Sequence, residues 1–254
     1  MKRNKIKKKY LNQIVGGKIF IFDKLERSIF MCLKSLGLLL LLLLWGIVPS
    51  IILGIFGIGS STLSDTTKII VAFLSDLGFI LLLIKIYNKT LKENFKNFFN
   101  KDIVKHLKVA FRYWGIGMFM MVFSNLIISV ITNGQLAENE EAVRSLINVF
   151  PVYMAFQLMV YAPITEELIF RKSIRDITNY KWLYVFLSGL IFGGLHVLSS
   201  LKTAIDLLYL IPYCSLGFAF ALLYTKTNNI FSSMIVHAFH NGLALIIYLS
   251  AVIS

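Results

Sequence analysis

The feature that most restricts how this chain can fold is its succession of long apolar runs. The first extends from about residue 29 to residue 58, with seven consecutive leucines at 38–44 and a proline, Pro49, that predicts a kink. About 20 apolar residues in a helix cross the hydrocarbon core of a bilayer. The other candidate spans are residues 69–87, 109–132, 146–169, 182–201, 204–224 and 230–253. The sequence therefore predicts an all-α fold, a polytopic transmembrane helix bundle of about seven spans, or eight if a helix breaks near its end.

The charge distribution supports this class of protein and predicts an orientation. Charged residues make up 15% of the chain, against roughly 25% in a soluble domain, and the mean hydropathy is +0.75. The net charge of +13 comes largely from lysines and arginines before residue 28 and between residues 85 and 108, beside the ends of apolar runs. Such flanks are typical of cytoplasmic segments that meet anionic lipid headgroups. We therefore expect a lipid bilayer and no nucleic acid as the partner, with the N-terminus in the cytoplasm.

The same pattern predicts three units along the chain. They are a basic cytoplasmic segment, 1–28, the N-terminal transmembrane helices with a basic interfacial linker, 29–144, and a C-terminal transmembrane unit, 145–254. The linker, 88–107, has phenylalanines between lysines, so it is either a helix lying on the inner leaflet or a solvated loop. Residues 133–144 are acidic, which predicts a loop on the outer side.

The most unusual stretch lies at the end of the fourth predicted span and reads YAPITEELIFRKSIR, residues 161–175. It contains two adjacent glutamates, Glu166 and Glu167, followed by Arg171. A charged side chain in or at the edge of a membrane helix is costly, so it indicates a functional site. Glu167 and Arg171 are four residues apart and share a helix face, which predicts an ion pair. Glu166 lies about 100° away around the helix and is the freer carboxylate.

Three of the four histidines also lie in predicted spans, namely His196, His237 and His240. His196 follows Phe192 by four residues, and Asn241 follows His237 by four, so each pair shares a helix face. His240 either flanks the face of His237 or points away from it. One such histidine alone is often a helix-to-helix hydrogen bonder. Three of them with two glutamates are much harder to explain as structure.

Two further features of the predicted spans concern packing. Gly189 and Gly193 form a stripe of small residues that predicts close approach of a neighbouring helix. Asp76 and Asp206 are additional acids in apolar segments. Each either caps or bridges helices or lies on a substrate or proton path, and the sequence leaves this choice open.

Three motifs stand in order on successive predicted spans. They read Glu166-Glu167-x-x-x-Arg171, Phe192-x-x-x-His196 and His237-x-x-x-Asn241. This pattern resembles the CPBP family, the CAAX protease and bacteriocin-processing group of intramembrane endopeptidases, also called the Abi family. The resemblance covers residues 145–253, shows no departure at the motif positions, and identifies 145–254 as a CPBP-type catalytic core.

The resemblance implies a protease whose site is buried among the helices and is reached from the cytoplasmic side. Glu166 and His196 would activate a water molecule, and His237 and Asn241 would stabilise the oxyanion. Carboxylates and imidazoles suit general base catalysis, and amide or imidazole donors suit an oxyanion hole. An alternative mechanism uses Glu166, His196 and His237 as ligands of a zinc ion with an activated water. The sequence does not decide between the two.

The resemblance also implies that Glu167 and Arg171 hold the glutamate helix in place. Eukaryotic members cleave prenylated CAAX proteins. For a bacterial member the resemblance implies a membrane-associated peptide or protein as the substrate, such as a bacteriocin or pheromone precursor. The abundance of lysine, asparagine and isoleucine favours a bacterial cytoplasmic membrane as the location. An alternative function is that of a non-proteolytic bacteriocin-immunity or regulatory membrane protein of the same fold.

Overall fold

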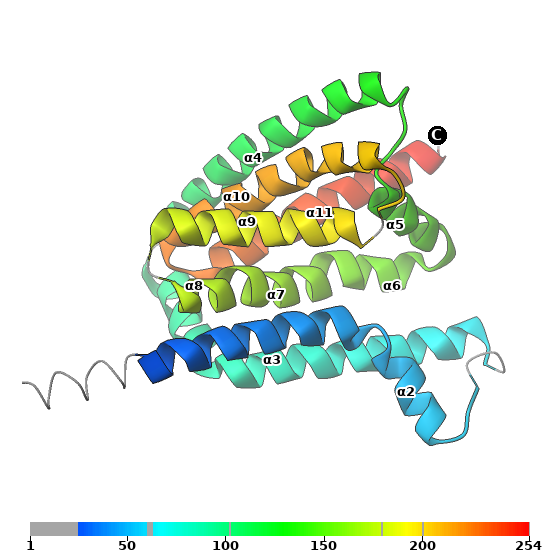
Figure 1. Cartoon of the computed structure of the whole chain (residues 1–254), viewed down its shortest axis with the longest axis horizontal. Coiled ribbons are helices and arrows are strands. Elements are labelled where there is room, and N and C mark those ends of the chain that lie inside the picture. The colour runs from blue at the N-terminus through cyan, green and yellow to red at the C-terminus, as the bar shows by residue number, and fades with distance from the viewer. Residues whose placement is uncertain (1–24, 60–62, 102, 179, 200, 254) are drawn as a thin grey trace, which may run out of the picture.

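The computed structural model describes residues 25–59, 63–101, 103–178, 180–199 and 201–253 (Figure 1). These residues form helices joined by short turns, with no strand among them, so the predicted all-α fold is confirmed. Six helices within the described ranges are long and apolar enough to cross a membrane. They are Leu25–Trp45, α3 (Asp65–Lys101), α4 (Ile103–Ile131), α9 (Lys181–Leu198), η4 (Ala204–Tyr209) joined to α10 (Leu210–Thr227), and α11 (Ile230–Ile253). Residues 1–24 of the predicted basic segment lie outside the described part, and the orientation stays a prediction.

The predicted fourth span, 146–169, is not one of these six: α5 (Glu138–Val149) ends inside it, and a continuous helical run that alternates between α and π geometry begins only at Pro151. Its segments are α6 (Pro151–Phe156), η2 (Gln157–Tyr161), α7 (Ala162–Glu166), η3 (Glu167–Ser173) and α8 (Ile174–Ile177). In Figure 1 this run lies between the two N-terminal helices on one side and α9, α10 and α11 on the other. In π geometry each N–H bonds to the carbonyl five residues earlier, and such segments are frequent at functional sites. The adjacent glutamates stand where α7 passes into η3.

The first span breaks where its proline predicts a kink. The helix that ends at Trp45 is followed by α2 (Val48–Ile55), which has Pro49 in its first turn. α3 then returns beside the first helix (Figure 1). The Trp45 indole N–H donates to the Ser75 carbonyl at 3.2 Å, and its ring stacks on Phe79 with centroids 4.5 Å apart. These contacts join the two N-terminal helices into one layer.

The described residues of the predicted linker, 88–101 and 103–107, are helical, and this part of the chain packs against α11. α3 continues through it and bends at Tyr87, where φ of −105° and ψ of 15° depart from helical values. Beyond the bend Phe98 is buried. Asn94 caps α11, because its side-chain oxygen accepts the N–H of Ile230 at 2.7 Å. The alternative of a solvated loop is therefore wrong, and the N-terminal unit is anchored to the start of the helix that carries two of the histidines.

The acidic segment predicted as an outer loop, 133–144, is partly helical instead. α5 (Glu138–Val149) begins within it and has three glutamates in its first turn. Carboxylates at that position are stabilised by the partial positive charge of a helix N-terminus. The acids that suggested a loop therefore start a helix.

α9 and α10 touch backbone to backbone. A Cβ added to Gly193 would lie 2.4 Å from Cys214 Sγ and 2.7 Å from Cys214 N, and one added to Gly217 would lie 2.8 Å from the Gly189 carbonyl oxygen. No side chain fits in that space, so glycine is required for this contact. The predicted glycine stripe is confirmed, and its neighbour is α10.

Candidate active site

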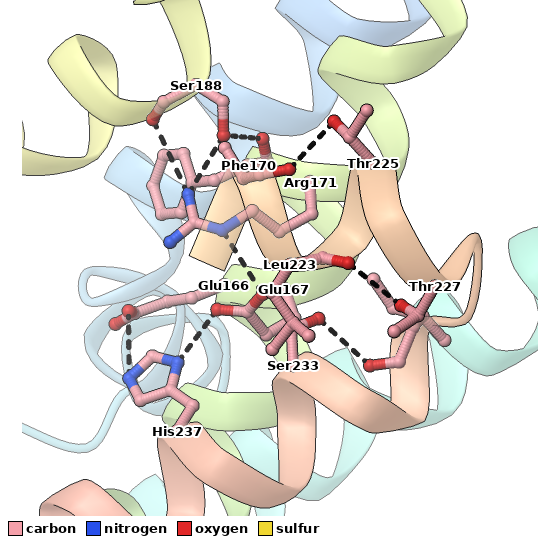
Figure 2. A network of polar contacts seen from close by, with 12 residues as sticks. Glu166, Glu167, Phe170, Arg171, Ser188, Leu223, Thr225, Thr227, Ser233 and His237 are labelled. Atoms are coloured by element: carbon pink, nitrogen blue, oxygen red, sulfur yellow. Dashed lines mark hydrogen bonds and ion pairs between the residues drawn. The ribbon is translucent and has the colours of Figure 1, made fainter. Parts of the chain in front are cut away.

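The centre of the site is a buried ion pair within the glutamate helix, the helical run from α6 to α8 at residues 151–177. The side chains of Glu167 and Arg171 have no exposed surface, and Arg171 Nε lies 3.2 Å from Glu167 Oε2 (Figure 2). Their four-residue spacing places them on one face, as the sequence indicates. Either charge alone would be expensive to bury, whereas the pair leaves this part of the helix neutral.

Arg171 is held on its other side by residues of α9 and α10. Its Nη1 donates to Ser188 Oγ at 3.0 Å, and this hydroxyl donates to the Phe170 carbonyl at 2.7 Å (Figure 2). The guanidinium carbon lies 4.8 Å from the ring centroid of Phe192 and 5.8 Å from that of Phe220. Nη2 has no hydrogen-bond acceptor among the described residues. The aromatic faces offset this lack, because a ring face attracts a cation.

His237 connects the two glutamates. Its Nδ1 lies 2.9 Å from Glu167 Oε1, and its Nε2 lies 3.8 Å from Glu166 Oε2 (Figure 2). An ionised carboxylate only accepts hydrogen bonds, so Nδ1 carries the hydrogen in the contact with Glu167. The Glu166 side chain is 18% exposed, and its Oε2 has no hydrogen-bond partner in the described part of the chain. Glu166 therefore keeps an oxygen available for a further group, as its position around the helix predicts.

Asn241 is held by a carbonyl that the glutamate helix cannot satisfy by itself. In η2 the N–H of Ala162 donates to the carbonyl of Gln157, five residues earlier. The Leu158 carbonyl would need the N–H of residue 163 in the same pattern, and Pro163 has none. Asn241 Nδ2 donates to this carbonyl at 2.9 Å. The proline and the π geometry together create the acceptor that orients Asn241.

His196 joins this group through Phe192. Its Nδ1 lies 2.9 Å from the Phe192 carbonyl oxygen, so Nδ1 carries a hydrogen and Nε2 is the proton acceptor of the neutral ring. The Phe192 ring lies 4.5 Å from the His196 ring and 6.1 Å from that of His237, between centroids. His196 also stacks on Tyr213, with centroids 5.0 Å apart. These contacts fix the plane of the imidazole.

A small cavity lies beside His196 at the end of α9. It is lined by Ala137, Glu138, Asn139, His196, Val197, Asp206 and Tyr209. Glu138 forms an ion pair with Lys202, and this hydrogen-bonded contact raises the pKa of the Lys202 ammonium. Asp206 accepts the N–H of Thr203 at 2.7 Å, so it caps η4. This end of α9 lies beside α5, and the implied access from the cytoplasmic side stays a prediction.

The zinc alternative does not fit the arrangement of the described residues. Among them, no group of three or more His, Cys, Asp or Glu side chains could hold a metal ion. His237 directs its two nitrogens to two carboxylates, and His196 directs Nδ1 to a backbone carbonyl. Zinc sites in enzymes use three protein ligands around one point. Glu166, His196 and His237 do not form such a set here.

Some residues of the site could not be predicted from the sequence. Ser188 and Phe220 carry no signal, because an isolated serine or phenylalanine is ordinary in a membrane span. Pro163 does carry one, since a proline inside an apolar run indicates a disrupted helix.

His240 accepts the indole N–H of Trp114 at 3.4 Å, so it is tied to α4. This contact gives no support for a role of His240 in the chemistry.

The fold and the site define a class of protein. The long apolar helices make it a multi-pass integral membrane protein. Within the bundle, Arg171, Glu167, His237 and Glu166 follow one another in contact, an unbroken series of ionisable groups supplied by α7, η3 and α11. Such a series, enclosed by apolar helices, is the arrangement of a membrane-embedded polar site.

Comparisons with known proteins assign the family. Residues 148–243 match the family model described as "Type II CAAX prenyl endopeptidase Rce1-like". YdiL of Bacillus subtilis, which is named as a membrane peptidase on a provisional basis, is 30% identical over 193 residues, which is 72% of each chain. YxdF of Lactococcus lactis is 28% identical over 137 residues, 52% of this chain and 73% of that protein. No solved structure matches the chain significantly. The chain belongs to the Rce1-like family, which confirms the family resemblance of its motifs.

Proposed function

We propose that this protein is an intramembrane endopeptidase that cleaves a membrane-associated peptide or protein in a bacterial cytoplasmic membrane. The observation that carries the proposal is the position of Glu166, a largely buried carboxylate with its Oε2 at 3.8 Å from His237 Nε2 and with no ion pair to an arginine among the described residues. The family and the peptidase name of the Bacillus relative support the same activity. The bacterial relatives support the location.

The charges of the site favour one proton shared between Glu166 and His237. Arg171 and Glu167 neutralise each other, so the remaining charge of the site is that of Glu166 and His237. His237 already carries a hydrogen on Nδ1, and one additional proton, shared with Glu166, makes this pair neutral. A net charge is costly among apolar helices, which favours this state. With the proton on His237 Nε2, Glu166 is free to take a proton from water, and the Nε2–H can donate to the developing oxyanion. Glu166 then passes its proton to the leaving amine.

His196 and Asn241 complete the proposed mechanism. His196 Nε2 accepts a hydrogen bond from the attacking water and orients it. Asn241 gives one amide hydrogen to the Leu158 carbonyl and keeps the second for the oxyanion. In this scheme Glu167 and Arg171 do not touch the substrate. They hold His237 through its Nδ1, so that its Nε2 faces Glu166.

Cleavage by the purified protein in vesicles tests the proposal. The wild type, Glu166→Gln and Glu141→Gln are incubated with a library of membrane-associated peptides in water labelled with heavy oxygen, and the products are read by mass spectrometry. Glu141 is an exposed glutamate of α5 and serves as the matched control. We expect the wild type and the control to cleave and to place one heavy oxygen in the new carboxyl group. Glu166→Gln should lose activity by about a hundredfold or more.

Three results would change this conclusion. Cleavage by Glu166→Gln at the wild-type rate refutes its role as the base. Loss of cleavage with a zinc chelator, restored by zinc, replaces the glutamate mechanism by a metal mechanism. If the wild type and Glu166→Gln cleave no peptide while both protect a host strain against a bacteriocin, the function is immunity by binding.

A further inference from the structure

Another buried carboxylate, Asp76, lies outside the proposed catalytic group. Asp76 stands in the membrane-crossing part of α3 and is 8% exposed. The Tyr153 hydroxyl donates to Asp76 Oδ2 at 2.8 Å, and Gln157 Nε2 donates to the same oxygen. Gln157 Nε2 also donates to the Tyr153 hydroxyl oxygen at 2.8 Å. The three side chains therefore close a triangle of hydrogen bonds that joins α3 to the glutamate helix.

The triangle acts on the segment whose geometry orients Asn241. Gln157 is the first residue of η2, and the next residue, Leu158, offers its carbonyl to Asn241 Nδ2 at 2.9 Å. Adjacent residues of one π turn are thus bound by two different helices, Gln157 by α3 and Leu158 by α11. In α geometry the N–H of Ala162 would bond to the Leu158 carbonyl and Asn241 would lose its acceptor. The π register of η2 therefore decides whether Asn241 is held.

We propose that Asp76 is a positioning residue for Asn241. By binding Gln157 and Tyr153, it holds η2 in its π register and keeps the Leu158 carbonyl free of helix donors. A buried amide or hydroxyl that loses its acceptor in an apolar environment costs free energy, so the native register is favoured while Asp76 is present. This inference rests on the proposed function, because it assigns Asn241 to the oxyanion. It gives the N-terminal helices a part in a site whose motif residues all lie in the C-terminal unit.

The first test is a double-mutant cycle on cleavage kinetics. We expect Asp76→Ala to lower kcat by about tenfold or more and to leave KM within about twofold. The loss of kcat should not exceed the loss caused by removing one oxyanion donor. Asp76→Asn should recover part of the loss, because its amide oxygen still accepts from Tyr153 and Gln157. In an Asn241→Ala background, Asp76→Ala should add no further loss, since both act through one side chain. Trp45→Phe is the matched control, because it removes a bond to Ser75, the residue before Asp76, and leaves the hydrogen bonds of Asp76 in place.

The second test does not depend on activity. In protein labelled with ¹⁵N-asparagine, the side-chain amide signal of Asn241 is assigned through its loss in Asn241→Ala. It should shift in Asp76→Ala and in Tyr153→Phe but not in Trp45→Phe. An unshifted signal, or losses of kcat that multiply in the double mutant, overturns the positioning role. A wild type that cleaves nothing instead refutes the proposed function, and the amide signal still decides the contact. If Asp76→Ala does not fold, Asp76→Asn and Tyr153→Phe carry both tests.

Discussion

Replacing Arg171 by methionine should destabilise the protein much more than replacing both members of its ion pair. Arg171 and Glu167 are completely buried and lie 3.2 Å apart. Arg171→Met leaves the Glu167 carboxylate buried, with His237 Nδ1 at 2.9 Å and the Ser233 side chain as its remaining polar contacts. Methionine is unbranched and apolar, so it fills the space between the two aromatic rings that cover the guanidinium. Ser188 keeps its bond to a backbone carbonyl, so no second polar group is stranded.

The size of the effect follows from the burial of the pair. Removing one partner of a buried ion pair costs about 3–5 kcal/mol, whereas replacing both by well-packed apolar residues of similar volume is often neutral. For a chain of this size, 1 kcal/mol corresponds to about 2–4 °C in melting temperature. Arg171→Met should therefore melt about 6–20 °C below the wild type. Glu167→Gln combined with Arg171→Met should recover most of this loss, because Gln still accepts from His237 Nδ1.

Thermal denaturation in detergent, followed by the fraction of protein that stays monodisperse in size-exclusion chromatography, measures these shifts. Arg144→Met is the matched control, because it breaks a partly exposed pair with Glu140 at 2.8 Å, and such pairs contribute about 0–1 kcal/mol. If Arg171→Met melts with the wild type, the pair is not an energetic centre of the site. A double variant that melts as low as Arg171→Met would show that the isolated charge is not the cause of the loss.

Two further variants test the packing around the site. Gly193→Ala should lower the melting temperature clearly, because its Cβ would lie 2.7 Å from a backbone atom of Cys214, while Gly194→Ala should change it little, since the nearest atom to its Cβ is 3.8 Å away; equal shifts in a thermal scan would contradict the close contact. Asn94→Ala should cost about 1 kcal/mol and speed amide hydrogen exchange at Ile230, because the cap of α11 is lost. Unchanged exchange there would mean that the cap does not hold the start of this helix.

The parts of the structure that follow from spacing along one helix could be predicted from the sequence. The pairing of Glu167 with Arg171 and the close packing at Gly193 both follow from helical periodicity. The contact of His237 with both glutamates could not be predicted, because periodicity does not show how one helix is rotated against another. The cap that Asn94 provides joins residues 136 positions apart, and a common residue type gives no sign of it. The prediction of a loop at the acidic start of α5 is wrong because the same charges suit a loop and a helix N-terminus.

The spacing of the central ion pair has a consequence for how the protein is made. Glu167 and Arg171 lie on the same helical segment, so they can neutralise each other while that segment enters the bilayer. His237, the other partner of Glu167, belongs to α11, which leaves the ribosome 70 residues later. A single charge at the centre of an inserting helix costs about 2.5–3.5 kcal/mol. Because its counter-ion is local, the glutamate segment need not wait in the translocon for the last helix, and α11 can dock against a segment that is already in the lipid.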